Sequence, residues 1–227
     1  MNIEILQLKE GAARAHGLTV IIDVFRAMTV EAYVMNTHPK DLIPMASVEE
    51  AYAYRDSHPG TILMGERGGV KCPGFDFGNS PSAVCDFDFN GRTVVHTTSA
   101  GTQGIALAGG ASEILCGSLV CAGAIARYIQ KQNPEHVSLV CMGLGGRKET
   151  REDTLCAEYI KGLLEGNRVN LLRGAWECRM DDGAKFFAGR DEVFPEADFW
   201  LSLEADRFDF ALKVEKGADE LMHTVRI

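Results

Sequence analysis

The chain has 227 residues, of which 46% are apolar and 24% are charged. This balance is ordinary for a folded globular protein and excludes a disordered or fibrous one. The formal net charge of −9 repels nucleic acid, and no basic stripe offsets it, so nucleic-acid binding is not expected. Glu4 stands where a secretory signal would carry basic residues, and no apolar run reaches the roughly 20 residues of a membrane span. We therefore expect a cytoplasmic protein without membrane contact.

The cysteines and histidines give no sign of a disulfide framework or a zinc site. Seven cysteines are spread singly without a C-x-x-C pair, which predicts reduced, buried thiols. The histidines do not form a pair at zinc-ligand spacing. If a metal binds, oxygen ligands and Mg²⁺ are therefore expected. The sequence leaves a homo-oligomer open.

Short apolar runs alternate with helical patterns along the first two thirds of the chain. The predicted strands are residues 19–22, 42–45, 61–64, 93–96, 112–116 and 137–142. The predicted helices are residues 27–35, 47 to about 58, one from about 100, one ending at 131 and one from about 151. Because the strands are continuously apolar, we expect a mainly parallel sheet buried on both faces, in a three-layer αβα sandwich.

The pattern is weaker from about residue 167, where the chain is predicted to be mostly helical. Residues 184–189, 197–205 and 207–216 are predicted as short amphipathic helices, and residues 220–227 as a last strand. No linker separates a second domain. We therefore expect residues 1–227 to form a single α/β domain.

Polar clusters follow the predicted strands. In open parallel sheets, ligands bind beyond the carboxyl ends of the strands, so these clusters should converge in one crevice. The clusters are residues 23–26, 65–71, 78–81, 97–102 and 151–154. The glycine-rich segment 143–148 resembles a phosphate-binding turn, but it matches neither common nucleotide-binding motif.

Two of these clusters combine acidic and basic side chains. Asp23 follows four apolar residues, so its carboxylate needs a cation, a helix N-terminus or a set of hydrogen bonds. A metal site, a helix cap and an ion pair with Arg26 all meet that need. Glu66, Arg67 and Lys71 share a glycine-rich loop, which suits a metal-plus-phosphate site or, alternatively, an ordinary surface loop.

Two further clusters carry hydroxyl groups at predicted helix starts. Thr98 and Ser99 open a helix whose free amides would bind an oxyanion, although a cap without a ligand fits as well. Asn79 and Ser80 precede Pro81, which suits the first helical position, so Ser80 is also interpreted as a cap.

The last cluster places two acids in the first turn of a helix. The helix dipole keeps Glu152 and Asp153 ionised, which makes them available to a divalent cation or useful only to the helix itself. Cys156 lies four residues after Glu152 and would be reactive if it lay near the cluster.

Four segments together resemble the 2-phosphosulfolactate phosphatase family. They are I-D-V-F-R-A at 22–27, G-E-R-G-G-V-K at 65–71, G-F-D-F-G-N-S-P at 74–81 and E-D-T-L-C-A at 152–157. The resemblance extends from about residue 23 to 157 in the same order, and is weaker around residues 209–216. It implies a Mg²⁺-dependent phosphatase that hydrolyses 2-phosphosulfolactate to sulfolactate, on the route to coenzyme M.

The chain departs from the family pattern at two places. The family usually has T-T-N-G-T-R where this chain has T-T-S-A-G-T-Q at 97–103, so Ala100 and Gln103 mark a missing amide and a missing cation. The segment after Trp200 also lacks an expected His-Gly. Loss of the cation would shift specificity, because a charge-assisted contact is worth about 1.5–3 kcal/mol.

These observations give a hypothesis for the site and its small anionic substrate. The metal ligands would be Asp23, Glu66 and Asp153, with Glu152 as an alternate. The catalytic residues would be Asp23, Arg26, Glu66 and Asp153. The phosphate and substrate would contact Arg67, Lys71, Asn79, Ser80, Thr98 and Ser99. One carboxylate would either orient water or attack phosphorus directly. The alternatives are a phosphatase for another small phosphorylated acid and a non-catalytic relative that binds a small anionic metabolite.

Overall fold

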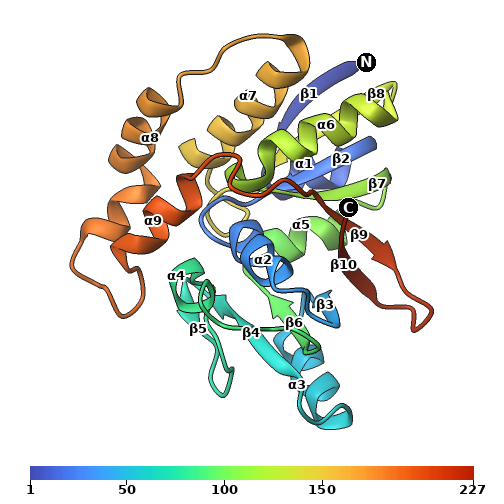
Figure 1. The fold of residues 1–227 in the computed structure, drawn as a ribbon, viewed down its shortest axis with the longest axis vertical. Coiled ribbons are helices and arrows are strands. Elements are labelled where there is room, and N and C mark those ends of the chain that lie inside the picture. The colour runs from blue at the N-terminus through green and yellow to red at the C-terminus, as the bar shows by residue number, and fades with distance from the viewer.

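The strands of the computed structural model, which describes residues 1–227, form two sheets (Figure 1). In spatial order, the first sheet contains β1 (Asn2–Gln7), β8 (His136–Cys141), β2 (Gly17–Ile22), β7 (Ala111–Gly117), β9 (Leu212–Lys216) and β10 (Met222–Arg226). The second sheet contains β3 (Asp41–Pro44), β6 (Thr93–Thr97), β4 (Ile62–Arg67) and β5 (Val70–Lys71).

Most neighbouring strands run parallel. The pairs β1–β8, β8–β2 and β2–β7 are parallel in the first sheet, and β3–β6 and β6–β4 are parallel in the second. Only β5, β9 and β10 pair antiparallel with their neighbours. The predicted α/β class with mainly parallel strands is therefore confirmed. The sequence predicts a single sheet, whereas the structure divides the strands between two.

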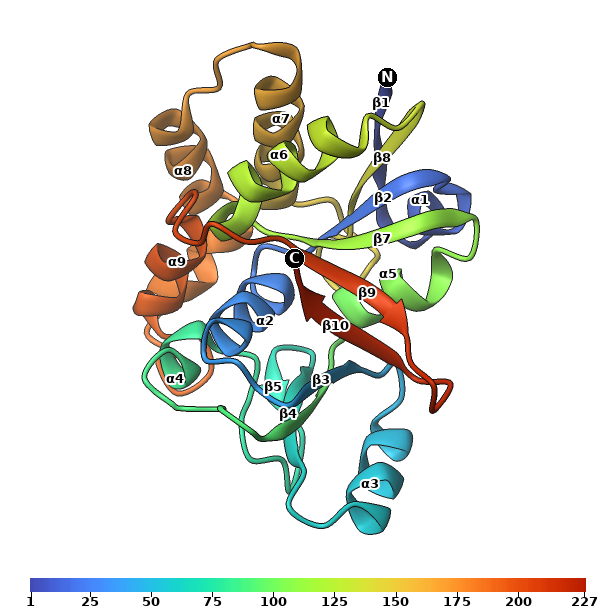
Figure 2. The same ribbon diagram turned by 45° about the vertical axis from the view of Figure 1, so that its right-hand side comes forward.

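Helices cover both faces of the first sheet, which gives the predicted three layers. Helices α1 (Leu8–Arg14) and α5 (Gly101–Leu107) pack on one face, and α6 (Ala122–Gln132) and α7 (Arg151–Glu165) pack on the other (Figure 2). Their packing encloses a large apolar core, in which Ile21 and Leu115 of the central strands are fully buried.

Two further helices lie near the second sheet. Helix α2 (Ala27–Asn36) leads from the first sheet to the second and contacts α5 and β7. Helix α3 (Val48–Ser57) covers β4 and β6 and encloses a smaller core that includes Ile43, Leu63 and Val95. Ser47 caps α3, because its hydroxyl accepts the amide of Glu50 at 3.2 Å.

The β9–β10 hairpin joins the two sheets. Strand β10 lies beside β3, so the sheets meet edge to edge (Figure 2). The prediction of a helix at residues 207–216 is wrong, whereas the strand predicted at 220–227 is confirmed by β10. In β9, buried Leu212 and Val214 alternate with Lys213 and Glu215, which is the period of a strand.

The part of the chain between β8 and β9 is largely helical. Helix α8 (Leu171–Met180), the 3-10 helix η2 (Asp182–Phe187) and α9 (Glu196–Leu203) pack against one another, against α7 and against the short helix α4 (Pro81–Val84). Helices lie close to the predicted segments 184–189 and 197–205, and α8 was not predicted. None of the helices in the structure has the length and apolar character needed to cross a membrane.

The seven cysteines are all free, and six of them are buried. The prediction of reduced, buried thiols is therefore confirmed for all but Cys85, which is partly exposed.

Candidate active site

A cavity of about 760 Å³ lies where the carboxyl ends of strands from both sheets meet. Lys9, Asp23 and Gly143 follow β1, β2 and β8 of the first sheet. Glu66 lies at the end of β4, and Ser99 follows β6, in the second sheet. The convergence expected from the sequence therefore holds for four of the five clusters, and only residues 151–154 lie outside the lining. The cavity draws on two sheets, whereas the sequence predicts one.

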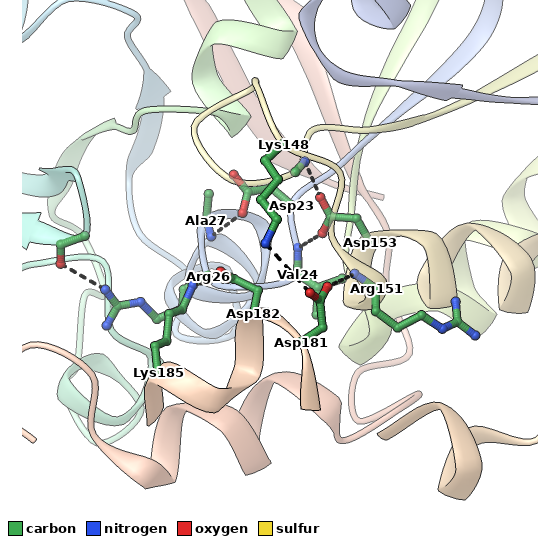
Figure 3. Close-up of polar contacts among 12 residues, drawn as sticks. Asp23, Val24, Arg26, Ala27, Lys148, Arg151, Asp153, Asp181, Asp182 and Lys185 are labelled. Carbon is green, nitrogen blue, oxygen red and sulfur yellow. Dashed lines mark hydrogen bonds and ion pairs between the residues drawn. The ribbon is translucent and has the colours of Figure 1, made fainter. Parts of the chain in front are cut away.

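Asp23 is a buried carboxylate at the start of the loop between β2 and α2. Its side chain is 6% exposed, and its Oδ1 accepts the amide of Ala27, the first residue of α2, at 3.3 Å (Figure 3). Burial, with a smaller contribution from the charge of Glu66, raises the pKa of Asp23 to about 6. The ion pair with Arg26 does not form, because Arg26 pairs elsewhere.

Glu66 is held at the end of β4 by main-chain donors. Its Oε1 accepts the amide of Ser99 at 2.7 Å, and its Oε2 accepts the amide of Gly69 at 2.6 Å. The strand comes close to β6 here, since a Cβ at Gly65 would lie 2.1 Å from the carbonyl oxygen of Thr97. With Glu66 only 6% exposed, the alternative of an ordinary surface loop is wrong for this residue.

Asp153 ties two loops of the first sheet together from behind the cavity. Its Oδ1 accepts the amide of Val24 at 2.8 Å, and its Oδ2 accepts the amide of Gly143 at 2.7 Å (Figure 3). Burial, and then the charges of Glu152 and Asp23, hold the pKa of Asp153 well above its usual range. Asp153 does not line the cavity, so the structure places it as a support for the loops that do.

Glu152 is buried next to Asp153 and forms no ion pair. Its Oε2 has no hydrogen-bond partner, and the side chain does not line the cavity. Burial, and then the nearby charge of Asp182, raise the pKa of Glu152 to about 8. Cys156 on the same helix is fully buried, and burial holds the pKa of its thiol well above the usual range, so it is not a reactive thiolate.

Arg26 lines the cavity and is fixed by the C-terminal helical segment. Its Nη1 donates to Asp198 of α9 at 2.8 Å and to the carbonyl of Val193 at 2.9 Å, and its Nη2 donates to the carbonyl of Gly69 at 3.1 Å. Asp198 is fully buried and also accepts the hydroxyl of Ser80 at 2.8 Å. Ser80 therefore binds Asp198 and does not line the cavity.

Arg67 and Gln103 lie side by side at the second sheet. Arg67 donates to the carbonyl of Ala46 at 3.0 Å and to the hydroxyl of Thr97 at 2.9 Å, and Gln103 donates to the same Ala46 carbonyl at 2.7 Å. Arg67 lines the cavity and has no acidic partner. Lys71 is exposed and opens onto neighbouring hollows of the surface rather than this cavity.

The remaining predicted polar residues divide between the cavity and local structure. Ser99 and Asn79 line the cavity, and Asn79 Oδ1 lies 3.2 Å from Nε2 of buried His96. Thr98 does not line it. Its hydroxyl accepts the amide of Thr102, in the first turn of α5, at 3.1 Å, and its own amide donates to the hydroxyl of Thr102 at 3.0 Å. Thr98 therefore bonds to the start of α5, as in the alternative without a ligand.

Three cations of the cavity are not among the predicted site residues: Lys9, Arg147 and Lys185. Lys185 is paired with Asp182, both labelled in Figure 3, and lies 5.4 Å from the ring centroid of Phe194. Lys9 follows a strand that was not predicted, and Lys185 reaches the cavity only through long-range packing. The glycine-rich segment 143–148 was a usable signal for Arg147, but it matches no motif.

No group of three or more His, Cys, Asp or Glu side chains in the protein is arranged to hold a metal ion. Asp23 and Glu66 are the two predicted metal ligands that line the cavity, and Glu152 and Asp153 lie outside its lining. The structure thus brings together two of the four acids, and the metal itself stays a prediction.

Comparison with known proteins covers most of the chain. The model of the family described as 2-phosphosulpholactate phosphatase matches residues 4–190. A protein of Bacillus subtilis named probable 2-phosphosulfolactate phosphatase is 28% identical over 223 residues, which is 96% of each chain. Proteins with the same name from Thermus thermophilus and Caldicellulosiruptor saccharolyticus are 33% and 37% identical, over 83% and 65% of this chain and 75% and 62% of theirs. Since the family match covers most of the chain and every strand end that lines the cavity, this chain belongs to the 2-phosphosulfolactate phosphatase family.

Proposed function

We propose that this protein hydrolyses a small anionic phosphate monoester in the cavity, either 2-phosphosulfolactate or a related phosphorylated 2-hydroxy acid. The observation that carries the proposal is the meeting of Asp23 and Glu66, two buried carboxylates from different sheets, with cations that have no acidic partner. Carboxylates and free cations in one cavity suit phosphoryl transfer, which relies on positioning and charge neutralisation. The names of the relatives favour this substrate.

Arg67 is the cation that we assign to the phosphate. It stands next to Glu66, and three protein oxygens fix its guanidinium without cancelling its charge. A protein with a net charge of −9 needs such a local cation to attract an anion. The predicted roles of Lys71, Ser80 and Thr98 at the phosphate have less support, because these side chains do not line the cavity.

Mg²⁺ fits this site only as an ion that keeps most of its water. The donor set consists of carboxylate oxygens, and no three-ligand protein cage exists. Mg²⁺ is commonly bound by one or two carboxylates together with substrate phosphate and water. Glu66 would hold it together with the substrate phosphate and water, and when bound it would neutralise charge on the phosphoryl oxygens.

Asp23 is the group that we assign to proton transfer. In the net reaction, a water oxygen bonds to phosphorus, the ester P–O bond breaks, and one proton passes from water to the departing alcohol oxygen. With a pKa of about 6, the carboxylate of Asp23 can take up and release a proton near neutral pH, as a general base requires. This assignment selects the water route over attack by the carboxylate itself.

Turnover of phosphate monoesters by the purified protein tests the proposal, with Mg²⁺ and after chelation with EDTA. We expect Mg²⁺-dependent release of inorganic phosphate from 2-phosphosulfolactate. Asp23→Asn should lower kcat by about 10²–10⁴-fold, the usual contribution of a general base. The exposed Asp86→Asn variant should keep full activity.

Two results would count against the proposal. The first is the absence of turnover for every phosphate monoester with any divalent cation. The second is tight calorimetric binding of sulfolactate or phosphosulfolactate without turnover, which would establish the non-catalytic alternative.

A further inference from the structure

The cations around the cavity differ in whether their charge is already balanced. Arg26 is paired with Asp198, and Lys185 is paired with Asp182. Arg67, Lys9 and Arg147 have no acidic side chain within 4.0 Å. In a protein with a net charge of −9, unpaired cations that gather at one cavity indicate that the anionic partner is the ligand.

Lys9 and Arg147 come from a different part of the fold than Arg67. Arg67 ends β4 of the second sheet, whereas Lys9 follows β1 and Arg147 lies in the loop after β8 of the first sheet. Because β1 and β8 are parallel neighbours, the two cations lie beyond the same ends of adjacent strands. They form a second cationic group, separate from the one beside Glu66.

Packing places Lys9 against the loop that carries Arg147. A Cβ at Gly146 would lie 2.7 Å from Cε and 2.8 Å from Cγ of Lys9, so the lysine stem runs along this glycine. The amide of Gly145, which lines the cavity, donates to no main-chain or side-chain acceptor. The neighbouring Lys148 is excluded from the group, because it faces Asp181 at 3.8 Å (Figure 3).

We propose that Lys9 and Arg147, with the amide of Gly145, bind an anionic group of the substrate other than its phosphate, namely the carboxylate or the sulfonate. This inference rests on the proposed phosphatase function and deepens it. It also explains how the chain binds a multiply charged substrate with Gln103 in place of a cation, since Gln103 is committed to the Ala46 carbonyl. Residues that follow strands of the first sheet would bind the carboxylate or sulfonate.

Three esters that differ by one anionic group at a time test the subsite. Isopropyl phosphate has only the phosphate, 2-phospholactate adds a carboxylate, and 2-phosphosulfolactate adds a sulfonate to that. We expect Lys9→Met and Arg147→Met each to raise KM for 2-phosphosulfolactate by about 10- to 100-fold, the range of a charge-assisted hydrogen bond, with kcat nearly unchanged. The kcat/KM for isopropyl phosphate should stay the same.

Matched controls separate a local effect from a general loss of charge. Lys131→Met removes an exposed lysine of α6 that does not line the cavity and should leave all three substrates unaffected. Lys9→Arg keeps the cation and should restore most of the affinity. If the carboxylate alone is bound, KM for 2-phospholactate should rise as much as KM for 2-phosphosulfolactate.

The outcomes distinguish the subsite from the proposed function. Equal losses on isopropyl phosphate and 2-phosphosulfolactate would overturn the subsite while leaving the phosphatase intact. Unchanged KM values for both anionic esters in the two Met variants would overturn it as well. A wild-type protein without turnover of any of the three esters would instead contradict the proposed function itself, and binding of sulfolactate weakened by Lys9→Met would then still support the subsite.

Discussion

Four acidic side chains are buried around the cavity, and none of them forms an ion pair. Asp23, Glu66, Glu152 and Asp153 are all less than 7% exposed. The hydrogen bonds that Asp23, Glu66 and Asp153 accept come from neutral donors, and one oxygen of Glu152 has no donor at all. Burying a carboxylate without a cation disfavours its charged form. Burial raises the pKa of Asp23, Glu152 and Asp153, so these three acids reduce the stability of the folded protein at neutral pH.

Glu152→Gln should remove part of this cost. The pKa of Glu152 is about 8 in the folded protein and 4.5 when exposed, so between these values the folded state binds more protons than the unfolded state. The free energy of unfolding therefore falls as pH rises through this window. Urea unfolding in EDTA should show Glu152→Gln to be more stable than wild type at pH 8, by on the order of 1–3 kcal/mol, with little difference near pH 4.5.

Glu192→Gln serves as the control for that measurement, because Glu192 is exposed and has no ion pair. Its pH dependence should follow wild type. Parallel stability curves for wild type and Glu152→Gln between pH 5 and 8 would mean that Glu152 is ionised in the folded protein at neutral pH.

The sequence predicted those site residues whose role follows from a local pattern. Asp23 and Glu66 stand at the ends of apolar runs, and topology alone brings such ends together. Ser80 and Asp198 show the opposite case, because their contact joins residues 118 positions apart. Asp198 has no local signal beyond its place in a predicted amphipathic helix.

At the scale of elements, helix α9 fixes several residues in and near the cavity wall. Through Asp198 it holds the guanidinium of Arg26, the hydroxyl of Ser80 and the amide of Ser82 at 2.9 Å. The Arg26–Asp198 pair is 4% and 0% exposed. A buried pair of this kind is costly to break, because removing one partner leaves the other charge uncompensated.

Asp198→Asn should lower the free energy of unfolding by about 3–5 kcal/mol, since Arg26 then stays buried without a counter-charge. Denaturant unfolding at pH 7 measures the loss. Asp209→Asn is the matched control: its side chain is 89% exposed, it lies 3.7 Å from Arg226, and its loss should cost less than about 1 kcal/mol. A similar cost for both variants would show that Arg26 remains solvated or finds another acceptor.

Helices and strands were predictable where the spacing of apolar residues fits only one type of secondary structure. The parallel strands other than β1 contain continuous apolar runs, and the sequence places each of β2, β3, β4, β6, β7 and β8 within a few residues. Strand β1 alternates polar and apolar residues and is not predicted. The stretch ending at Lys216 was assigned to a helix although its buried residues alternate, because its polar ends suit an amphipathic helix equally well. Only pairing of β9 with β7 decides between the two.

At the scale of the whole molecule, a buried polar chain links the sheet junction to the cavity. Thr224 of β10 donates to Oε2 of Glu31 at 3.2 Å, and Oε1 of Glu31 lies 2.9 Å from Nδ1 of His96. His96 of β6 then contacts Asn79 in the cavity wall at 3.2 Å. Nothing in the local sequence predicts this chain, since it depends on how the two sheets meet.

Thr224→Val tests whether the junction supports the cavity. The variant keeps the shape of the side chain but leaves one oxygen of buried Glu31 without its donor, which should lower the free energy of unfolding by about 1–3 kcal/mol. Thr93→Val is the control, because its partner Asp41 is 30% exposed and water can replace the lost hydroxyl. If Glu31 orients His96 and Asn79, kcat/KM for 2-phosphosulfolactate should also fall in Thr224→Val and not in Thr93→Val, at temperatures where both variants are folded. Equal activity in the two variants would restrict the polar chain to stability, whereas a selective loss would make the meeting of the two sheets part of the site.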